Sequence, residues 1–264
     1  MVVCGDSDLE LNRDYESAAI YKWRKKRKKA FVLFICIVGI CFLVTRMVRV
    51  EDKTTVKVHN MHTEQNEKAI RYVASNMIKE DPKIAITFDD GPSPAWTPQL
   101  LDGLKERNVK ATFFLIGENA KNNPELVKRE AEEGHLIGNH TYHHVEITRV
   151  PDETAQEEIL MTNEVITGIT GEEVSYMRPP FGVWQKNLER KLDVMPVLWT
   201  IDPLDWTTDN EDEIINKVVT QAGENDIILL HDCYESSVNA ALRIVDILQK
   251  EGFEFVTVDE LIMN

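Results

Sequence analysis

Beyond residue 81, short apolar segments alternate with longer amphipathic ones. Uncharged, partly β-branched runs such as Ile84 to Phe88 are typical of strands buried on both faces of a sheet, and apolar residues at helical spacing indicate helices between them. Strands are expected at Lys83–Asp89, Ala111–Gly117, His135–Thr141, Tyr176–Pro180, Val194–Asp202, Asp226–His231 and Phe253–Val258, and helices at Pro98–Arg107, Pro124–Glu133, Asp152–Ile169, Glu211–Ala222 and Val238–Lys250. Strands alternating with helices predict an α/β fold with a parallel sheet closed, or nearly closed, into a barrel.

The N-terminal part of the chain follows another pattern. The 16 residues 30–45 carry no charge, and seven Lys and Arg residues occupy positions 22–29 just before them. This order predicts an uncleaved membrane anchor with a cytoplasmic N-terminus, lengthened by Met47 and Val48 and by snorkelling of Lys29 and Arg46. A cleaved signal peptide is the alternative, but its charged region would be unusually long and no small-x-small pattern precedes Arg46.

These patterns divide the chain into four expected parts. They are a cytoplasmic basic tail (1–29), a transmembrane helix (30–48), a polar stalk (49–82) and a domain outside the cell (83–264). Of the four cysteines only Cys233 falls in the outer domain. The sequence therefore excludes a disulfide within that domain, which has to be held together by its core.

Charge narrows the choice of partner. The whole chain has a formal net charge of −15, and residues 1–50 hold ten of its 30 basic and five of its 45 acidic residues. The remainder therefore holds 20 basic and 40 acidic residues, a net charge of about −20. Such an acidic domain is a poor match for nucleic acid or an anionic membrane and fits a neutral or cationic partner better.

Polar residues gather where the expected strands end. In parallel β/α barrels the carboxyl ends of the strands share one face, which carries the active site. The residues at these ends are Asp89 and Asp90 (first strand), His140 (third), Arg178 and Phe181 (fourth), Asp202 and Asp205 (fifth), and His231 and Asp232 (sixth). The Asp-Asp pair, stopped by Gly91-Pro92, could alternatively be a turn whose carboxylates only cap backbone N–H groups.

The segment His140 to His144 offers metal ligands. His140 and His144 with one Asp of the first strand would give zinc three protein ligands and an open position for water. The same set suits ferrous iron. His143 could replace His144 in a tighter turn, and a histidine cluster can also be ordinary surface or core.

Two further segments supply groups for proton transfer. Arg178, on a loop stiffened by two prolines, could hold a carboxylate ionised. A buried aspartate beside His231 would favour the imidazolium and make it a general acid. Trp206 and Leu229 could form a small apolar wall, although Trp206 could equally be core and His231 a capped strand end.

Five motifs in this order resemble the polysaccharide deacetylases, the NodB-homology family of carbohydrate esterases. They are Thr-Phe-Asp-Asp-Gly-Pro, His-Thr-x-x-His, Arg-x-Pro-Phe, Asp-x-x-Asp-Trp and Leu-x-His, between Thr87 and His231. The similarity covers Lys83 to the C-terminus. It implies a distorted (β/α)7 barrel and metal-dependent removal of acetyl groups from N-acetylated sugars.

The resemblance also implies roles for individual residues. Asp89 is the expected catalytic base, oriented by Arg178. The expected metal ligands are Asp90, His140 and His144. The expected metal is divalent, with zinc the first choice and cobalt or iron as alternatives.

The remaining roles concern the leaving group and the acetyl pocket. The resemblance implies that His231 is the catalytic acid, tuned by Asp205. Trp206 and Leu229 would line the acetyl pocket, and a backbone N–H near Phe181 would hold the oxyanion.

An anchored acetyl hydrolase outside the membrane leads us to expect N-acetylglucosamine of a cell-wall glycan, in particular peptidoglycan, as the substrate. The alternatives are N-deacetylation of chitin-like oligomers, O-deacetylation of xylan, and a non-catalytic module that only binds glycan. The completeness of the motifs argues against the last of these.

Overall fold

The structure is a computed structural model that describes residues 81–184, 188 and 192–263. The chain divides into the units Met1–Glu80 and Asp81–Asn264, and the described residues belong to the second. The predicted tail, anchor and stalk lie outside the described residues, apart from the last two stalk residues, Asp81 and Pro82. Within the described part of the chain, no helix is both long and apolar enough to cross a membrane.

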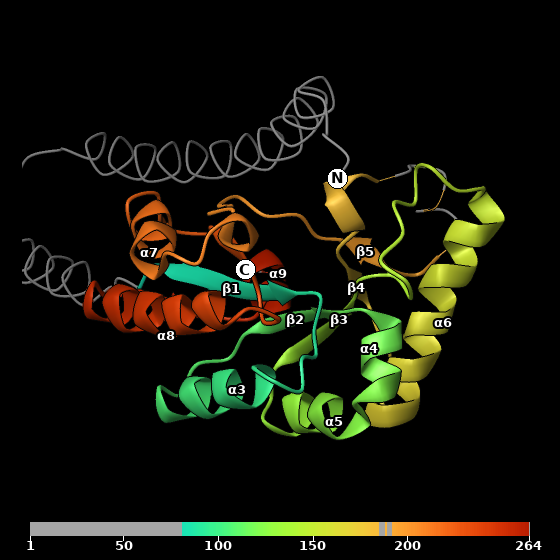
Figure 1. The fold of residues 1–264 in the computed structure, drawn as a ribbon, viewed down its shortest axis with the longest axis horizontal. Helices are drawn as coiled ribbons and strands as arrows, with labels where there is room; N and C mark the ends of the chain where they lie inside the picture. The colour runs from blue at the N-terminus through green and yellow to red at the C-terminus, as the bar shows by residue number, and fades with distance from the viewer. Residues whose placement is uncertain (1–80, 185–187, 189–191, 264) are drawn as a thin grey trace, which may run out of the picture. The chain divides into compact units, whose positions relative to one another are not determined.

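Seven parallel strands form one sheet (Figure 1). The strands are β1 (Lys83–Asp89), β2 (Thr112–Leu115), β3 (Leu136–Asn139), β4 (Tyr176–Met177), β5 (Met195–Pro196), β6 (Ile227–His231) and β7 (Glu254–Phe255). Their order is β5-β4-β3-β2-β1-β6, and β7 pairs with the start of β1. After β5 the chain bends until Ile201 forms a parallel bridge with Ile228 of β6. The result is a half-barrel, consistent with the predicted distorted (β/α)7 fold.

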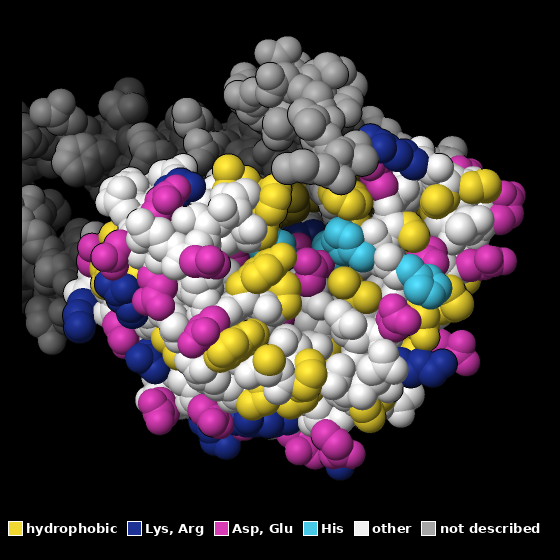
Figure 2. Space-filling model, viewed as in Figure 1, with side chains coloured by type: hydrophobic (Ala, Val, Ile, Leu, Met, Phe, Trp, Pro, Cys, Tyr) yellow, Lys and Arg dark blue, Asp and Glu magenta, His cyan; other side chains and the backbone are white. Residues whose placement is uncertain are grey.

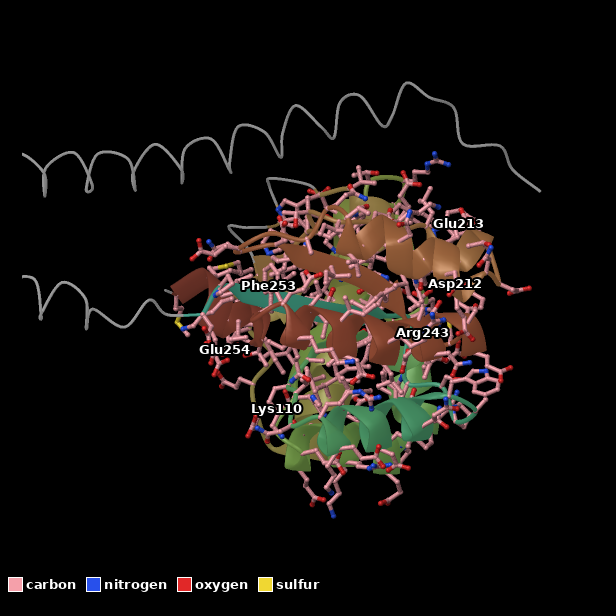
Figure 3. The ribbon with its side chains drawn as sticks, turned by 90° about the vertical axis from the view of Figure 1, so that its left-hand side faces the viewer. Lys110, Asp212, Glu213, Arg243, Phe253 and Glu254 are labelled. Carbon is pink, nitrogen blue, oxygen red and sulfur yellow. The ribbon has the colours of Figure 1, made fainter. Side chains whose placement is uncertain are left out.

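Helices cover this sheet in the order expected of an α/β fold. They are α3 (Thr97–Glu106), α4 (Gly117–Asn122), α5 (Pro124–Glu132), α6 (Asp152–Thr170), α7 (Glu211–Val219), α8 (Glu235–Lys250) and α9 (Val258–Met263). Arg243 of α8 forms ion pairs with Glu211 and Asp212 of α7 on the surface (Figure 3). Exposed ion pairs of this kind add little stability, so the helices are held mainly by their buried faces.

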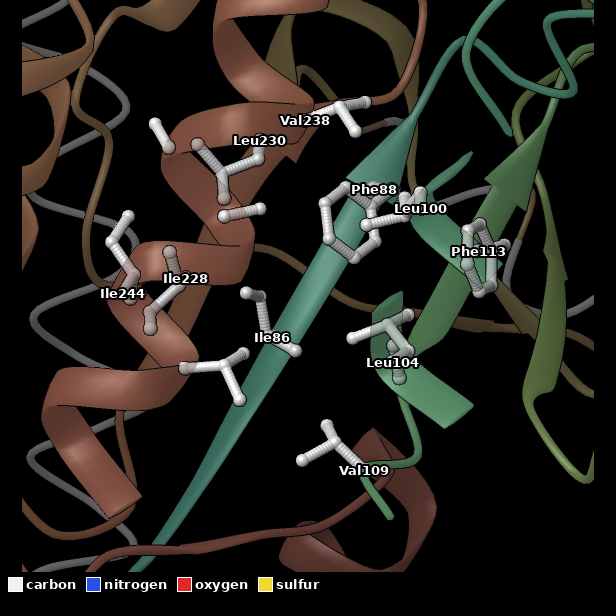
Figure 4. Close-up of a cluster of buried hydrophobic side chains, with 14 of the residues drawn as sticks. Ile86, Phe88, Leu100, Leu104, Val109, Phe113, Ile228, Leu230, Val238 and Ile244 are labelled. Carbon is white, nitrogen blue, oxygen red and sulfur yellow. The ribbon is translucent and has the colours of Figure 1, made fainter. Parts of the chain in front are cut away.

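The main core lies between the centre of the sheet and helices α3 and α8. Ile86 and Phe88 of β1 are fully buried, and the Phe88 ring stacks on Phe113 of β2 with 5.3 Å between centroids (Figure 4). Leu104 of α3 and Ile244 of α8 close the two sides of the same cluster. Removing a large side chain from such a core typically costs about 2–5 kcal/mol. The first strand therefore gives rigid support to the residues at its carboxyl end.

The sequence-based elements are confirmed in kind and order, but several bounds differ. The fourth and seventh strands are only two residues long, and Val258, predicted to end the seventh strand, begins α9. Six-residue helices α4 and α9 were not predicted, because so short a segment carries little periodic signal. The fifth strand, predicted to run to Asp202, forms a ladder only at Met195–Pro196. The carbonyl groups of Val197 and Leu198 accept from the Arg178 guanidinium instead, at 3.2 and 3.5 Å, so the chain leaves the sheet where it surrounds this side chain.

Candidate active site

The polar residues predicted at strand ends do converge at one edge of the sheet. In the register of β1 and β6, Asp89 lies directly opposite His231. His140 follows β3 and Arg178 follows β4, two neighbouring strands. Figure 2 shows histidine side chains next to acidic and hydrophobic ones near the centre of one face. Sheet topology thus gathers residues that are up to 142 positions apart in the sequence.

Asp89 is buried and paired with Arg178. Arg178 Nη1 lies 2.7 Å from Asp89 Oδ1 and also donates to Thr87 Oγ1 at 2.7 Å. The guanidinium is itself fully buried, with its Cζ 4.3 Å from the centre of the Phe114 ring. Burial lowers the pKa of Arg178, and the charge of Asp89 opposes that shift. The charged guanidinium of Arg178, which also donates to Thr87, therefore fixes the orientation of the Asp89 carboxylate.

Asp90 faces the two predicted histidine ligands. Its Oδ1 lies 3.4 Å from His140 Nε2 and 3.3 Å from His144 Nε2. These three ligand atoms all lie within 4.8 Å of one another, and they form the one possible metal-binding group found among the described residues. The backbone of Asp90 is left-handed, with φ of 71°, a conformation that non-glycine residues rarely adopt.

The three residues fit a divalent metal. Asp90 Oδ1 is buried and has no hydrogen-bond partner within the described part of the chain, and such atoms require an explanation. His140 Nδ1 is 2.6 Å from the Arg178 carbonyl oxygen, which can only accept, so Nδ1 carries the proton and the Nε2 lone pair faces Asp90. Tetrahedral zinc with ligands at about 2.0–2.1 Å separates the ligand atoms by about 3.3 Å, close to both Asp90 distances.

The pKa directions agree with this role. Burial alone would raise the pKa of Asp90, but His140, His144 and His231 lower it to about 2. Burial, together with His140, lowers the pKa of His144. Both residues are therefore in the unprotonated form that a metal ligand requires at neutral pH.

His143, which the residue pattern left open as a ligand, points elsewhere. Its Nδ1 lies 2.7 Å from Glu158 Oε1 of α6, and about half of the side chain is exposed. His144 instead lies beside His140, with 5.0 Å between their ring centroids. The geometry therefore groups His144, and not His143, with Asp90.

His231 is held by Asp205 through two hydrogen bonds. Asp205 Oδ1 lies 2.8 Å from His231 Nδ1, and Asp205 Oδ2 accepts from the His231 backbone N–H at 2.9 Å. Burial lowers the pKa of His231, but Asp205, together with Asp89 and Asp90, raises it to about 9. This raised pKa favours the protonated form of His231 at neutral pH. Asp202, which was predicted at the end of the fifth strand together with Asp205, accepts from the Leu204 N–H and is not part of the Asp205–His231 pair.

The predicted apolar residues differ in exposure. Phe181 is 60% exposed, has φ of 62°, and places its ring 5.0 Å from that of His144. Trp206, directly after Asp205, is 56% exposed, whereas Leu229 is 4% exposed. The structure thus brings Phe181 to the candidate metal site, while the acetyl-pocket role of Trp206 and Leu229 stays a prediction.

Two residues near the site were missed from the sequence. Tyr234 is exposed, and its ring centroid is 6.3 Å from that of His231. Because Tyr234 stands only three residues after His231, its place in the sequence could have indicated that it lies near the site. Glu158 is buried beside the histidine loop, but it lies 14 residues beyond His144 within a helix. No local pattern distinguishes it from the other acidic residues of α6.

Comparison with known proteins gives a consistent result. Residues 76–197 match the family described as polysaccharide deacetylase. The chain is 37% identical over 216 residues to the peptidoglycan-N-acetylglucosamine deacetylase PgdA of Listeria monocytogenes serotype 1/2a, covering 79% of this chain and 46% of that protein. It is 39% identical over 199 residues to a peptidoglycan-N-acetylglucosamine deacetylase of Bacillus cereus, covering 72% and 93%.

A solved structure shows the same fold. The peptidoglycan deacetylase PdaC of Bacillus subtilis matches with a TM-score of 0.67 and 39% identity, covering 69% of this chain and 90% of that one. The chain spans about half the length of the Listeria protein but nearly all of the Bacillus cereus protein. On these similarities and its family match, this chain belongs to the polysaccharide deacetylase family.

Proposed function

We propose that this chain is a metal-dependent hydrolase that removes N-acetyl groups from N-acetylglucosamine residues of a cell-wall glycan, in particular peptidoglycan. One observation carries the proposal. Asp90 Oδ1, which has no hydrogen-bond partner among the described residues, lies together with His140 Nε2 and His144 Nε2. The same strand ends carry an Arg-bound aspartate, Asp89, and an Asp-bound histidine, His231.

Asp90, His140 and His144 would hold the metal, with zinc as the first choice and cobalt or iron as alternatives. When bound, the metal polarises the acetyl carbonyl and orients the attacking water. Imidazole and carboxylate ligands suit all of these metals. The donor set therefore supports a divalent metal without fixing which one.

Asp89 acts as the general base. It takes one proton from the attacking water while the water oxygen bonds to the acetyl carbon. Arg178 holds Asp89 Oδ1, which fixes the orientation of the carboxylate toward the attacking water. This division of labour explains why two adjacent aspartates have different partners.

His231 acts as the general acid. It donates its proton to the sugar nitrogen as the C–N bond breaks, so the products are acetate and a sugar amine. Without that proton, cleavage would expel a strongly basic anion. Asp205 holds His231 in the correct tautomer and keeps it protonated.

The acetyl group would be bound by the apolar residues beside the site. We assign Trp206 and Leu229 to the methyl pocket, and a backbone N–H near Phe181 to the developing oxyanion. Exposed aromatic rings at Phe181 and Trp206 also offer apolar faces to a sugar.

The names of the relatives support peptidoglycan as the substrate, since the Listeria and Bacillus cereus proteins are both described as peptidoglycan-N-acetylglucosamine deacetylases.

We further propose that residues 30–48 anchor the chain by a single pass in the cell membrane, with an inner tail (1–29), an outer stalk (49–82) and the catalytic domain (83–264) outside. Protease treatment of intact cells tests this, because only an outward domain is accessible.

Acetate release is the decisive measurement. The full-length chain, purified in detergent, should release acetate from acetylated peptidoglycan strands when zinc or cobalt is supplied, and chelation should stop it. Chitin oligomers and acetylated xylan, assayed in parallel, distinguish the alternative substrates. No acetate from any of the three would refute the proposal and favour a binding module.

A further inference from the structure

The loop that carries both histidine ligands has an unfavourable backbone. Thr141 and His144 have φ values of 61° and 55°, in the left-handed region that non-glycine residues rarely adopt. Thr141 is also β-branched, which makes this conformation more costly. Residues in such conformations persist only where their surroundings hold them. The loop therefore requires contacts from outside itself.

Glu158 of α6 supplies three of these contacts. Its Oε2 accepts from the backbone N–H groups of Tyr142 and His143, at 3.0 and 2.8 Å, and its Oε1 lies 2.7 Å from His143 Nδ1. Glu158 is only 6% exposed. A buried carboxylate with several N–H partners is a strong and directional acceptor. All three bonds fall on the two residues between Thr141 and His144.

Other groups hold the rest of the loop: Asn139 Oδ1 accepts from the Thr141 N–H at 2.7 Å, and neighbouring backbone holds two carbonyl groups. The N–H groups of Gly117 and Glu118, at the start of α4, donate to the carbonyl oxygens of Thr141 and Tyr142 at 2.9 and 3.0 Å. A side chain at Gly117 would not fit, because a Cβ there would lie 2.5 Å from Thr162 Oγ1. The α4 contacts hold the carbonyl groups, whereas only Glu158 holds the N–H groups of Tyr142 and His143 among the described contacts.

We propose that Glu158 is a positioning residue for metal binding, which sets the affinity of the site by holding the loop between His140 and His144 in its left-handed conformation. Glu158 acts through the backbone and touches neither metal nor substrate. This inference rests on the proposed metal site. It adds a residue on α6 that decides whether His144 Nε2 can reach the same point as His140 Nε2 and Asp90 Oδ1.

Four variants separate this role from general stabilisation. E158A removes all three bonds, and E158D moves the carboxylate back by one carbon. E158Q retains an oxygen that can accept from both N–H groups. H143A removes only the ring contact. E157A is the matched control, because Glu157 is the neighbouring acidic residue on α6 and is exposed.

The measurement is the zinc dissociation constant of the metal-free, full-length chain, obtained by competition with a chromophoric chelator. Supporting residues of metal ligands typically change affinity by about 10–100-fold, so E158A should weaken zinc binding to that extent. E158D should weaken it less, while E158Q, H143A and E157A should remain close to wild type. Thermal unfolding of each metal-free variant shows whether the protein is folded.

The outcomes are distinct. Wild-type zinc affinity in folded E158A or, should E158A not fold, in E158D would overturn the role of Glu158. A lower unfolding temperature with unchanged zinc affinity would mean a structural role only, and would also overturn it. If the wild-type chain itself bound no zinc, the proposed metal site would fail instead, which separates the two hypotheses.

Discussion

Two acidic regions of this domain, the sheet edge at Asp90 and the interior around Asp232 and Glu130, place their carboxylates in opposite environments. At the sheet edge, Asp90 lies among three histidines that lower its pKa to about 2. Directly after His231, Asp232 is fully buried with the Thr97 hydroxyl as donor, and burial raises its pKa to about 7. Glu130 of α5 is also fully buried, and both of its carboxylate oxygens lack a hydrogen-bond partner among the described residues.

The difference shows what decides the charge of a buried acid. Burial disfavours the ionised form, and only nearby positive groups or donors restore it. Glu130 has no such group, so burial, with a smaller effect of Asp232, raises its pKa well above the usual range. The sheet edge therefore favours the ionised form of its acid, whereas burial in the interior region favours the protonated form.

The largest expected effect is on catalysis at the sheet edge. Asp89→Asn retains the shape and the contact with Arg178 but removes the base, so kcat should fall by about 1,000-fold. Zinc should stay bound, because Asp89 is not a proposed ligand. Acetate release and zinc content are measured on the same sample.

His140→Ala changes a proposed metal ligand instead of the proposed base. It should lose zinc as well as activity, because it removes a ligand. If Asp89→Asn remained active, or lost its zinc as His140→Ala should, the separate roles of Asp89 and Asp90 would be wrong.

Breaking the buried pair should cost stability. Arg178→Met leaves Asp89 buried without its guanidinium, and removing one partner of a buried pair typically costs about 3–5 kcal/mol. Urea unfolding measures the change. Arg243→Met is the control, because its ion pairs are exposed, and it should change stability far less. Equal losses of stability in Arg178→Met and Arg243→Met would contradict the expected difference between a buried and an exposed ion pair.

Asp205→Asn should change the pH dependence of the reaction. The Asp205 carboxylate raises the pKa of His231, and His231 has to be protonated to act as an acid. Removing the charge should lower the pKa of His231. The alkaline limb of the pH profile, where His231 loses its proton and activity falls, should therefore move to lower pH. The pH profile of kcat tests this, with exposed Asp209→Asn as the control. An unshifted alkaline limb would show that His231 is not the acid.

The smallest effect is expected in the interior region, and it has the opposite sign. Burial raises the pKa of Glu130 well above its ordinary value, so Glu130 destabilises the fold as the pH rises above that ordinary pKa. Glu130→Met should therefore stabilise the protein by about 1–3 kcal/mol at pH 7, and by less at pH 4. Urea unfolding at both pH values, with exposed Glu125→Met as control, measures it. Destabilisation at pH 7 would reveal a partner for Glu130.

Much of the fold follows from local sequence. The predicted first strand, Lys83–Asp89, has the observed bounds, because its apolar run ends at a Gly-Pro stop. Helices α6 and α8 were predicted with most of their residues, because they are long enough to show helical spacing. The bend after Pro196 was not predicted, because it depends on the carbonyl groups of Val197 and Leu198 meeting a guanidinium from another strand.

The sequence by itself determined which elements form, their order, and which chemical groups stand at the strand ends, because periodicity and turn residues act over a few positions. The tertiary structure decided which groups meet. Arg178 reaches Asp89 across 89 positions, and Glu158 takes His143 away from the ligand set. Such contacts depend on strand order and helix packing, which no short stretch of sequence encodes.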